Sequence, residues 1–274
     1  MGPWRFDPAI VAGLSLAAIA YVTGVRRVRE GGGKPVPRSR MWAFVAGLAV
    51  VYVALQSPVD TYAGVRFSIH MVQHLLLTML AAPLILLGAP STLAIRASPT
   101  SMKRVALLPA LRSRPMRFMS RPVVAWFSFI AVMWGSHYSS LYEAALRNDG
   151  LHALEHAVLL GSALLFWGPV VGLDPGPSRT SHPARILYLF LAMPQMAFLG
   201  LAIYASDHVW YPHYVEGMTR AAALADQHLA GALMWEAGTL AFVLALAAVL
   251  LDWMGSDERA AARAEARAAV EGVR

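Results

Sequence analysis

The fold is decided by residues 67–88, FSIHMVQHLLLTMLAAPLILLG, which contain no lysine, arginine, aspartate or glutamate. About 20 residues of this composition, wound as an α-helix, cross the roughly 30 Å hydrocarbon core of a bilayer. Six further apolar stretches of similar character surround it. We therefore expect an all-α polytopic membrane protein, a bundle of about seven transmembrane helices, over residues 7–25, 41–57, 67–88, 122–142, 151–172, 184–205 and 226–252.

Composition and charge agree with this class. Of the 274 residues, 57% are hydrophobic and only 14% are charged, about half the charged fraction usual for a soluble domain. Nineteen of the 23 lysines and arginines lie in the first, third and fifth connections and in the tail. Because positively charged flanks resist translocation, these segments are predicted to be cytoplasmic. The N-terminus is then outside and the C-terminus cytoplasmic.

The same charge pattern sets the expected domain organisation and excludes one class of partner. The net charge of +7 follows membrane topology rather than one basic stripe, so we do not expect nucleic-acid binding. We expect a single transmembrane domain at residues 1–252 and a charged cytoplasmic tail at residues 253–274.

The predicted topology places eight of the nine histidines toward the outer face. His70 with His74, and His152 with His156, are separated by four residues, so each pair lies on one face of a helix about one turn apart. Such a pair can bind one metal ion. A lone histidine at a helix end is more often a hydrogen-bonded interfacial residue, but the convergence of several histidines favours a ligand role.

A short pattern recurs at three predicted helix starts, where an amide or acid residue directly precedes a histidine. The three doublets lie at similar depth, where lipid would disfavour an imidazole, so we expect them to face one another. They are Gln73-His74, Glu155-His156 and Gln227-His228. The candidate metal ligands are therefore His70, His74, His152, His156 and His228.

Other polar residues near this face have two interpretations each. His137, His208 and His213 lie closer to loops, where a solvated histidine is as reasonable as a ligand. Glu236 lies about ten residues into the last span and needs a proton, a partner or a metal, and the outer histidines are the nearest candidates. Asp226 is expected to cap a helix or to orient an imidazole, with direct metal binding as the alternative.

Cysteine is absent, so a metal must bind histidine, methionine or carboxylate. An imidazole-rich site suits copper, zinc, iron or nickel. Methionines within the spans favour Cu(I), because thioethers are soft ligands, although methionine in apolar helices usually only packs. These residues are Met71, Met133, Met193, Met196 and Met234.

Three segments resemble the CtaG family of cytochrome c oxidase assembly factors. They are HMVQHLLL at residues 70–77, LHALEH at residues 151–156, and DQHLAG at residues 226–231 followed by Trp235 and Glu236. The resemblance covers roughly residues 41–252. It implies a membrane protein of the bacterial cytoplasmic membrane that delivers copper to, or inserts copper into, a haem-copper oxidase.

The resemblance also implies site residues and partners. The family's motif histidines fall on His70, His74, His152, His156 and His228 of this sequence. The implied partners are an oxidase subunit and a periplasmic or extracellular copper donor. On this interpretation the protein is not an enzyme.

Two other functions stay open at this point. A haem-binding membrane cytochrome also uses histidines on facing spans, although axial haem ligands seldom lie one helical turn apart. A metal-dependent membrane hydrolase would use Glu155 or Glu236 as general base beside a zinc-bound water. Zinc and haem iron are therefore the alternatives to copper. A transporter is disfavoured because few polar residues lie in the cytoplasmic half of the spans.

Overall fold

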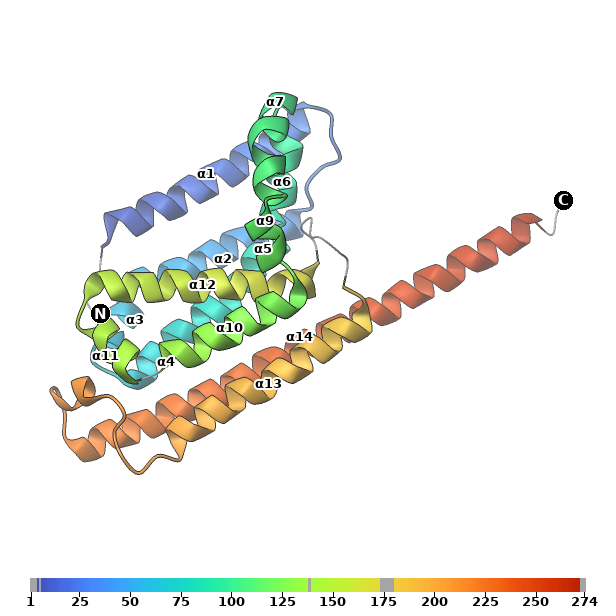
Figure 1. Cartoon of the computed structure of the whole chain (residues 1–274). Helices are drawn as coiled ribbons and strands as arrows, with labels where there is room; N and C mark the ends of the chain where they lie inside the picture. The colour runs from blue at the N-terminus through green and yellow to red at the C-terminus, as the bar shows by residue number, and fades with distance from the viewer. Residues whose placement is uncertain (1–3, 5, 138, 173–179, 272–274) are drawn as a thin grey trace.

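A computed structural model of the chain describes residues 4, 6–137, 139–172 and 180–271, and all regular structure in those residues is helical. Figure 1 shows long helices lying side by side in one bundle. Six helices are long and apolar enough to cross a membrane. The predicted all-α polytopic membrane fold is confirmed.

The long helices follow the predicted spans closely. They are α1 (Pro8–Glu30), α2 (Arg38–Gln56), α12 (Asp149–Val171), α13 (His182–Tyr204) and α14 (Arg220–Glu271), together with a third span built from α4 (Phe67–Leu75), η1 (Leu76–Ala81) and α5 (Ala82–Leu87). The remaining helices are α3 (Pro58–Ala63), α6 (Pro90–Ala97), α7 (Thr100–Met102), η2 (Lys103–Leu107), α8 (Leu108–Leu111), α9 (Arg114–Met119), α10 (Pro122–Ser136), α11 (Ser139–Leu146) and η3 (Pro212–Val215).

The helix predicted over residues 122–142 is interrupted. The apolar helix α10 has 15 residues and rises about 22 Å, short of the roughly 30 Å hydrocarbon core. It ends at His137, whose backbone N–H donates to the Trp134 carbonyl at 3.2 Å, and α11 follows as a separate helix. The expected seven spans are therefore six long helices and one short apolar helix, and His137 lies at a helix end.

The third span departs from α-helical geometry directly after its histidine pair. Residues Leu76–Ala81 form the π-helix η1, and Pro83 follows it. Proline has no N–H to donate to the carbonyl four residues earlier, so the α-helical pattern cannot continue unchanged here. The Thr78 hydroxyl donates to the His74 carbonyl at 2.7 Å, and the Trp167 indole N–H of α12 donates to the Thr78 carbonyl at 2.8 Å. Such π segments occur frequently at functional sites.

Helices α13 and α14 pack with their backbones in contact. A Cβ atom on Gly200 would lie 2.8 Å from the Gly231 carbonyl oxygen, and one on Gly231 would lie 2.5 Å from the Tyr204 nitrogen. Glycine allows this approach because it has no side chain, as is common between helices in membranes. The contact brings Met196 of α13 and Met234 of α14 into the same buried core.

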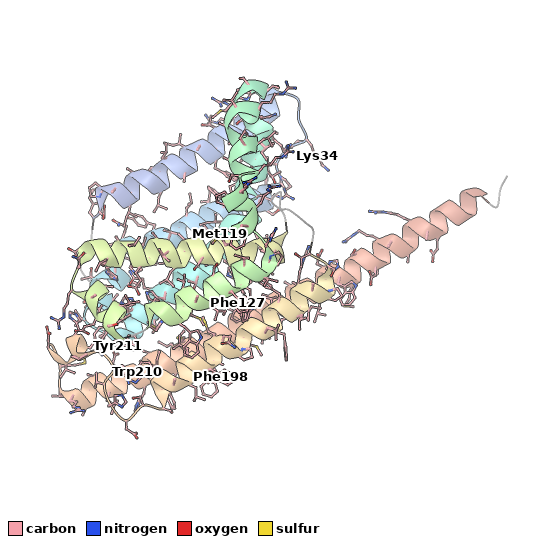
Figure 2. All side chains as sticks on the ribbon, viewed as in Figure 1. Lys34, Met119, Phe127, Phe198, Trp210 and Tyr211 are labelled. Carbon is pink, nitrogen blue, oxygen red and sulfur yellow. The ribbon has the colours of Figure 1, made fainter. Side chains whose placement is uncertain are left out.

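The outer surface of the bundle is apolar, as contact with lipid requires. Phe127 on α10 and Phe198 on α13 point away from the bundle and are 62% and 59% exposed (Figure 2). In water such side chains would be unfavourable, whereas in a bilayer they contact acyl chains.

The two ends of the bundle carry different connections. Helices α3 and α11, predicted to lie outside, gather at one end, and α6 and α7, predicted to be cytoplasmic, lie at the other (Figure 1). Which end faces the cytoplasm stays a prediction from the charge pattern. Helix α14 does not end at residue 252. It has 52 residues in total and is about 78 Å long, so the predicted boundary between transmembrane domain and tail does not coincide with a helix end.

Candidate metal centre

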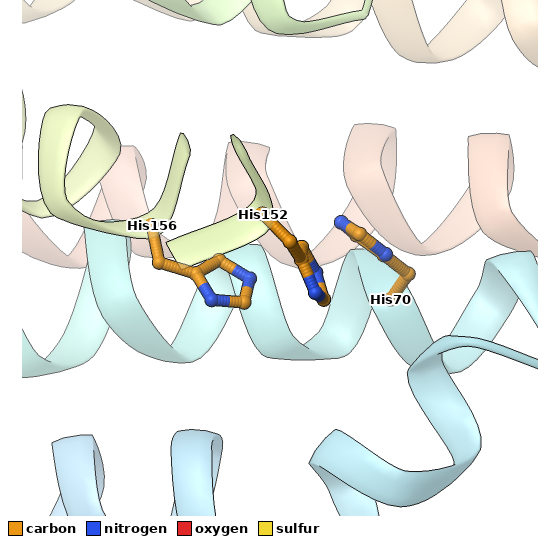
Figure 3. A group of neighbouring side chains, drawn as sticks. All are labelled: His70, His152 and His156. Carbon is orange, nitrogen blue, oxygen red and sulfur yellow. The ribbon is translucent and has the colours of Figure 1, made fainter. Parts of the chain in front are cut away.

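Two neighbouring helices supply the candidate centre. His70 and His74 lie on α4, and His152, Glu155 and His156 lie on α12. Figure 3 shows His152 and His156 directed from α12 toward His70 on α4. Each pair therefore faces the other across the contact between the two helices, as the sequence predicted for these four histidines.

Both helices begin just before their first histidine, and polar caps hold these starts in place. The Asn148 side-chain oxygen accepts from the Leu151 N–H at 3.0 Å in the first turn of α12. In the first turn of α4, Asp226 of α14 accepts from the Ser68 N–H at 3.2 Å and from the Ser68 hydroxyl at 2.5 Å. These bonds satisfy amide groups that a helix end leaves unpaired, and the bonds from Ser68 to Asp226 also tie the start of α4 to α14.

The five side chains form one cluster with two overlapping groups of possible ligands. The group of His70, His152 and His156, and the group of His70, His74 and Glu155, each have all ligand atoms within 4.8 Å of one another. The His70 and His74 Nε2 atoms are 2.7 Å apart, and the His74 Nε2 lies 3.8 Å from Glu155. Ligand atoms around a tetrahedral ion bound at about 2.0–2.1 Å are separated by about 3.4 Å, so small side-chain rotations suffice to bind one.

Burial leaves several of these ligand atoms without hydrogen bonds. The exposed fractions of His70, His74 and His156 are 0%, 5% and 7%. The His156 Nε2 atom and both Glu155 carboxyl oxygens have no hydrogen-bond partner within the described residues. Buried polar atoms rarely stay unpaired, because each lost bond costs about 1–3 kcal/mol. A bound cation would pair with these atoms, so the residues present fit a metal ion.

The three doublets noted in the sequence do not have equivalent roles. The Gln73 amide donates to the Ala54 carbonyl at 2.9 Å, and the Gln227 amide oxygen accepts from the Trp210 N–H at 2.8 Å. Both glutamines therefore hold neighbouring segments of the chain in place. Glu155 instead points into the histidine cluster.

Sequence reasoning missed Glu155 as a candidate ligand and considered it only as a general base. The signal that could have found it is its position three residues after His152, which places both side chains on the same helical face as His156. Its side chain is 8% exposed, so a charged carboxylate there needs a cation nearby.

His137 lies beside the cluster, at the end of α10. Its ring centroid is 5.6 Å from that of His74, and the side chain is buried. Its Nδ1 lies 2.7 Å from the Met133 carbonyl, and its Nε2 lies 3.4 Å from the Met71 sulfur. The Tyr211 hydroxyl donates to the His137 carbonyl at 2.8 Å. Of the two interpretations of His137, the solvated one is therefore wrong.

The other three histidines predicted at this face contact the backbone or side chains of loops. The His228 Nε2 lies 3.1 Å from the Ser206 carbonyl oxygen, and the His208 Nδ1 lies 3.2 Å from the Ser206 hydroxyl. The His213 Nε2 lies 2.9 Å from the Gly64 carbonyl oxygen. Neither possible ligand group contains these residues. The structure therefore brings together four of the five principal candidates and places His228 elsewhere.

The two acids singled out in the sequence also lie outside the possible ligand groups. Asp226 caps α4, which was one of its expected roles. Glu236 is exposed on the surface of α14, so the expected contact with the outer histidines is wrong. The reason is helical geometry, because Glu236 is two residues from buried Met234 and so lies about 200° around the helix from it.

An aromatic layer covers the cluster at its end of the bundle. The Tyr142 ring lies 4.9 Å from the His70 ring and 5.5 Å from the Phe67 ring. The Tyr142 and Tyr214 hydroxyl oxygens are 2.9 Å apart and share a hydrogen bond. Burial raises the pKa of Tyr214 well above its ordinary value, so this hydroxyl stays neutral. The layer covers His70 at this end of the cluster.

The fold and centre define a multi-pass membrane protein with a cluster of imidazole and carboxylate side chains near one end of its bundle. Residues 19–256 match the family described as cytochrome c oxidase caa3 assembly factor (Caa3_CtaG), so the chain belongs to this family and the predicted resemblance is confirmed.

Curated relatives come from mycobacteria and carry no described function. The chain is 31% identical to an uncharacterized protein of Mycobacterium tuberculosis and 32% identical to one of Mycobacterium leprae. Each match covers 97% of this chain and 41% of the relative, so the chain spans about two fifths of the length of these proteins. No solved structure matches the chain.

Proposed function

We propose that this membrane protein binds copper at the centre on α4 and α12 and transfers it to cytochrome c oxidase during assembly. The observation that carries the proposal is the pair of overlapping groups, His70 with His152 and His156, and His70 with His74 and Glu155, each of which offers three ligand atoms within 4.8 Å of one another. The buried His156 Nε2 atom and Glu155 oxygens, which have no hydrogen-bond partner among the described residues, support a cation there rather than ordinary packing. Imidazole and carboxylate without thiolate suit copper, and the family supplies the recipient.

A carrier must release its ion as well as bind it, and the arrangement supports exchange. Both ligand groups contain His70, so an ion can pass between them by replacing one or two ligands at a time. The centre lies near the end of the bundle that the charge pattern places outside the cytoplasmic membrane. We propose that the ion arrives there from a periplasmic or extracellular donor and leaves toward an oxidase subunit.

The two alternative functions have weaker support. A haem would have to lie between histidines, yet the His70 and His74 nitrogens are 2.7 Å apart and the His152 and His156 rings are 4.3 Å apart. When two imidazoles bind a haem iron axially, the iron and the porphyrin ring lie between them. The histidines of each pair are too close together for this. A zinc hydrolase would use Glu155 as base, but the aromatic layer of Tyr142 and Tyr214 restricts the access of water and substrate.

The proposal is tested by metal analysis and a visible spectrum of the detergent-purified protein after loading with copper. We expect the wild type to bind copper, and both the His70→Ala/His74→Ala and the His152→Ala/His156→Ala variants to lose one equivalent of it. The matched control is His208→Ala, because the ring of this exposed histidine contacts the Ser206 hydroxyl of its own loop, and the variant should retain the metal.

Other outcomes would contradict the copper carrier in distinct ways. A Soret band lost with the same histidines would show a cytochrome. Zinc alone, with Glu155→Gln retaining the metal but losing a hydrolytic activity, would show a hydrolase. A copper content left unchanged by both double variants would place the site elsewhere in the chain.

A further inference from the structure

Four methionines from four different helices meet at one small cavity beside the histidine cluster. The cavity has a volume of about 20 Å³, room for about one water-sized sphere. Its sulfur-bearing lining residues are Met71 of α4, Met133 of α10, Met196 of α13 and Met234 of α14. All four are at most 3% exposed. Nothing in the spacing of these residues along the sequence indicates that they meet.

Two histidines, His74 and His137, also line the cavity. The Nε2 lone pair of His137 is directed at a methionine sulfur. His137 Nδ1 lies 2.7 Å from the Met133 carbonyl, which can only accept, so Nδ1 carries the proton in the neutral ring. Nε2 is then an acceptor, yet its neighbour at 3.4 Å is the Met71 thioether, also an acceptor. Two acceptors face each other with no proton to share.

A soft cation resolves this mismatch. Metal-binding histidines commonly donate their second ring N–H to a backbone carbonyl, which is the bond that His137 makes to Met133. Thioether sulfur prefers Cu(I), whereas Zn²⁺ and Cu(II) prefer nitrogen and oxygen. If the four methionines only packed in the core, their burial would be explained, but the orientation of the His137 Nε2 toward the Met71 sulfur would not.

The cavity also continues from the histidine cluster. His74 belongs to the cluster and lines the cavity as well. Of the other four lining residues, Leu75 follows His74 directly, and Thr78, Phe129 and Leu159 lie deeper in the bundle, away from the end that carries the cluster. His74 is therefore shared between the histidine cluster and the methionine cavity.

We propose that Met71 and His137, together with Met133, Met196 or Met234, form a second metal site that is selective for Cu(I). This inference rests on the proposed copper function for the identity of the ion, but it assigns a separate site with a different ligand set. The outer cluster would accept copper as Cu(I), and the methionine site would hold it in the same oxidation state.

The test is a titration of the full-length protein with Cu(I) under reducing, anaerobic conditions against a colorimetric Cu(I) chelator, with X-ray absorption at the copper edge. We expect two equivalents in the wild type and a copper–sulfur contribution in the absorption spectrum. Met71→Leu/Met133→Leu should lose one equivalent and the sulfur contribution, whereas His152→Ala/His156→Ala should lose the other equivalent and keep the sulfur contribution.

Met193→Leu is the matched control, since Met193 lies in α13 but does not line the cavity and should bind as the wild type does. Selenomethionine protein provides a measurement without substitution, because a copper–selenium contribution must appear if methionine binds the ion. If the wild type binds one equivalent of copper through nitrogen, with no sulfur or selenium scattering, this result would overturn the methionine site and leave the outer centre supported. No histidine-dependent copper at all would overturn both.

Discussion

Replacing Gly231 with alanine tests how far the protein depends on the close contact between α13 and α14. A Cβ atom at this position would lie 2.5 Å from the Tyr204 nitrogen and 2.6 Å from the Gly200 carbonyl oxygen. Ordinary contact for a Cβ begins near 3.4 Å, so the two helices must separate by about 0.9 Å. The obstructing atoms belong to the backbone and cannot rotate away.

The expected cost follows from this geometry. Forcing extra atoms into a packed core costs about 1–3 kcal/mol, and we expect the upper end of that range because no side chain can move aside. Gly161→Ala on α12 is the matched control, since a Cβ there meets nothing within 4 Å. Alanine should leave the stability at this position unchanged or raise it by up to about 1 kcal/mol.

The assay is reversible unfolding in mixed micelles, with the free energy of unfolding compared between the two variants and the wild type. Copper–sulfur scattering should weaken in Gly231→Ala, because Met196 and Met234 lie on the separated helices, while copper on the α4 and α12 histidines should persist. A Gly231→Ala protein within about 0.5 kcal/mol of the wild type would refute the described packing of α13 against α14.

Four further predictions follow from particular contacts. Asp226→Ala should lower the free energy of unfolding by about 1–2 kcal/mol, because it removes the acceptor for both Ser68 donors, and chemical denaturation measures this. Trp167→Phe should cost about 1–2 kcal/mol in the same assay by leaving the Thr78 carbonyl unpaired, and an unchanged midpoint would contradict the bond. Glu236→Gln should leave the metal stoichiometry unchanged, since this residue is exposed, and metal loss would place it in the site after all. Acidification should release bound copper and alkalinisation should restore it, because only neutral imidazole binds a metal; equilibrium dialysis across pH tests the sign.

Much of the membrane fold and part of the centre could be predicted from local sequence. Apolar runs such as residues 67–88 predict spanning helices because a bilayer requires about 20 apolar residues in a row. The i, i+4 spacing of His70 with His74, and of His152 with His156, predicts shared helical faces because the α-helical repeat is local. The break of α10 at His137 was not predicted, since an apolar run does not reveal where its helix ends.

What only the tertiary structure decided is which polar and sulfur-bearing side chains share a site. Glu155 joined the histidines, Glu236 and His228 did not, and four methionines met at one cavity. In lipid the outward and the inward faces of a helix are both apolar, so hydropathy does not reveal which face is buried. The rotation of each helix comes from contacts distant in sequence, such as Gly200 against Gly231 and Asp226 against Ser68. These contacts determine the ligand set, whereas the sequence by itself determined the helices and the histidine pairs.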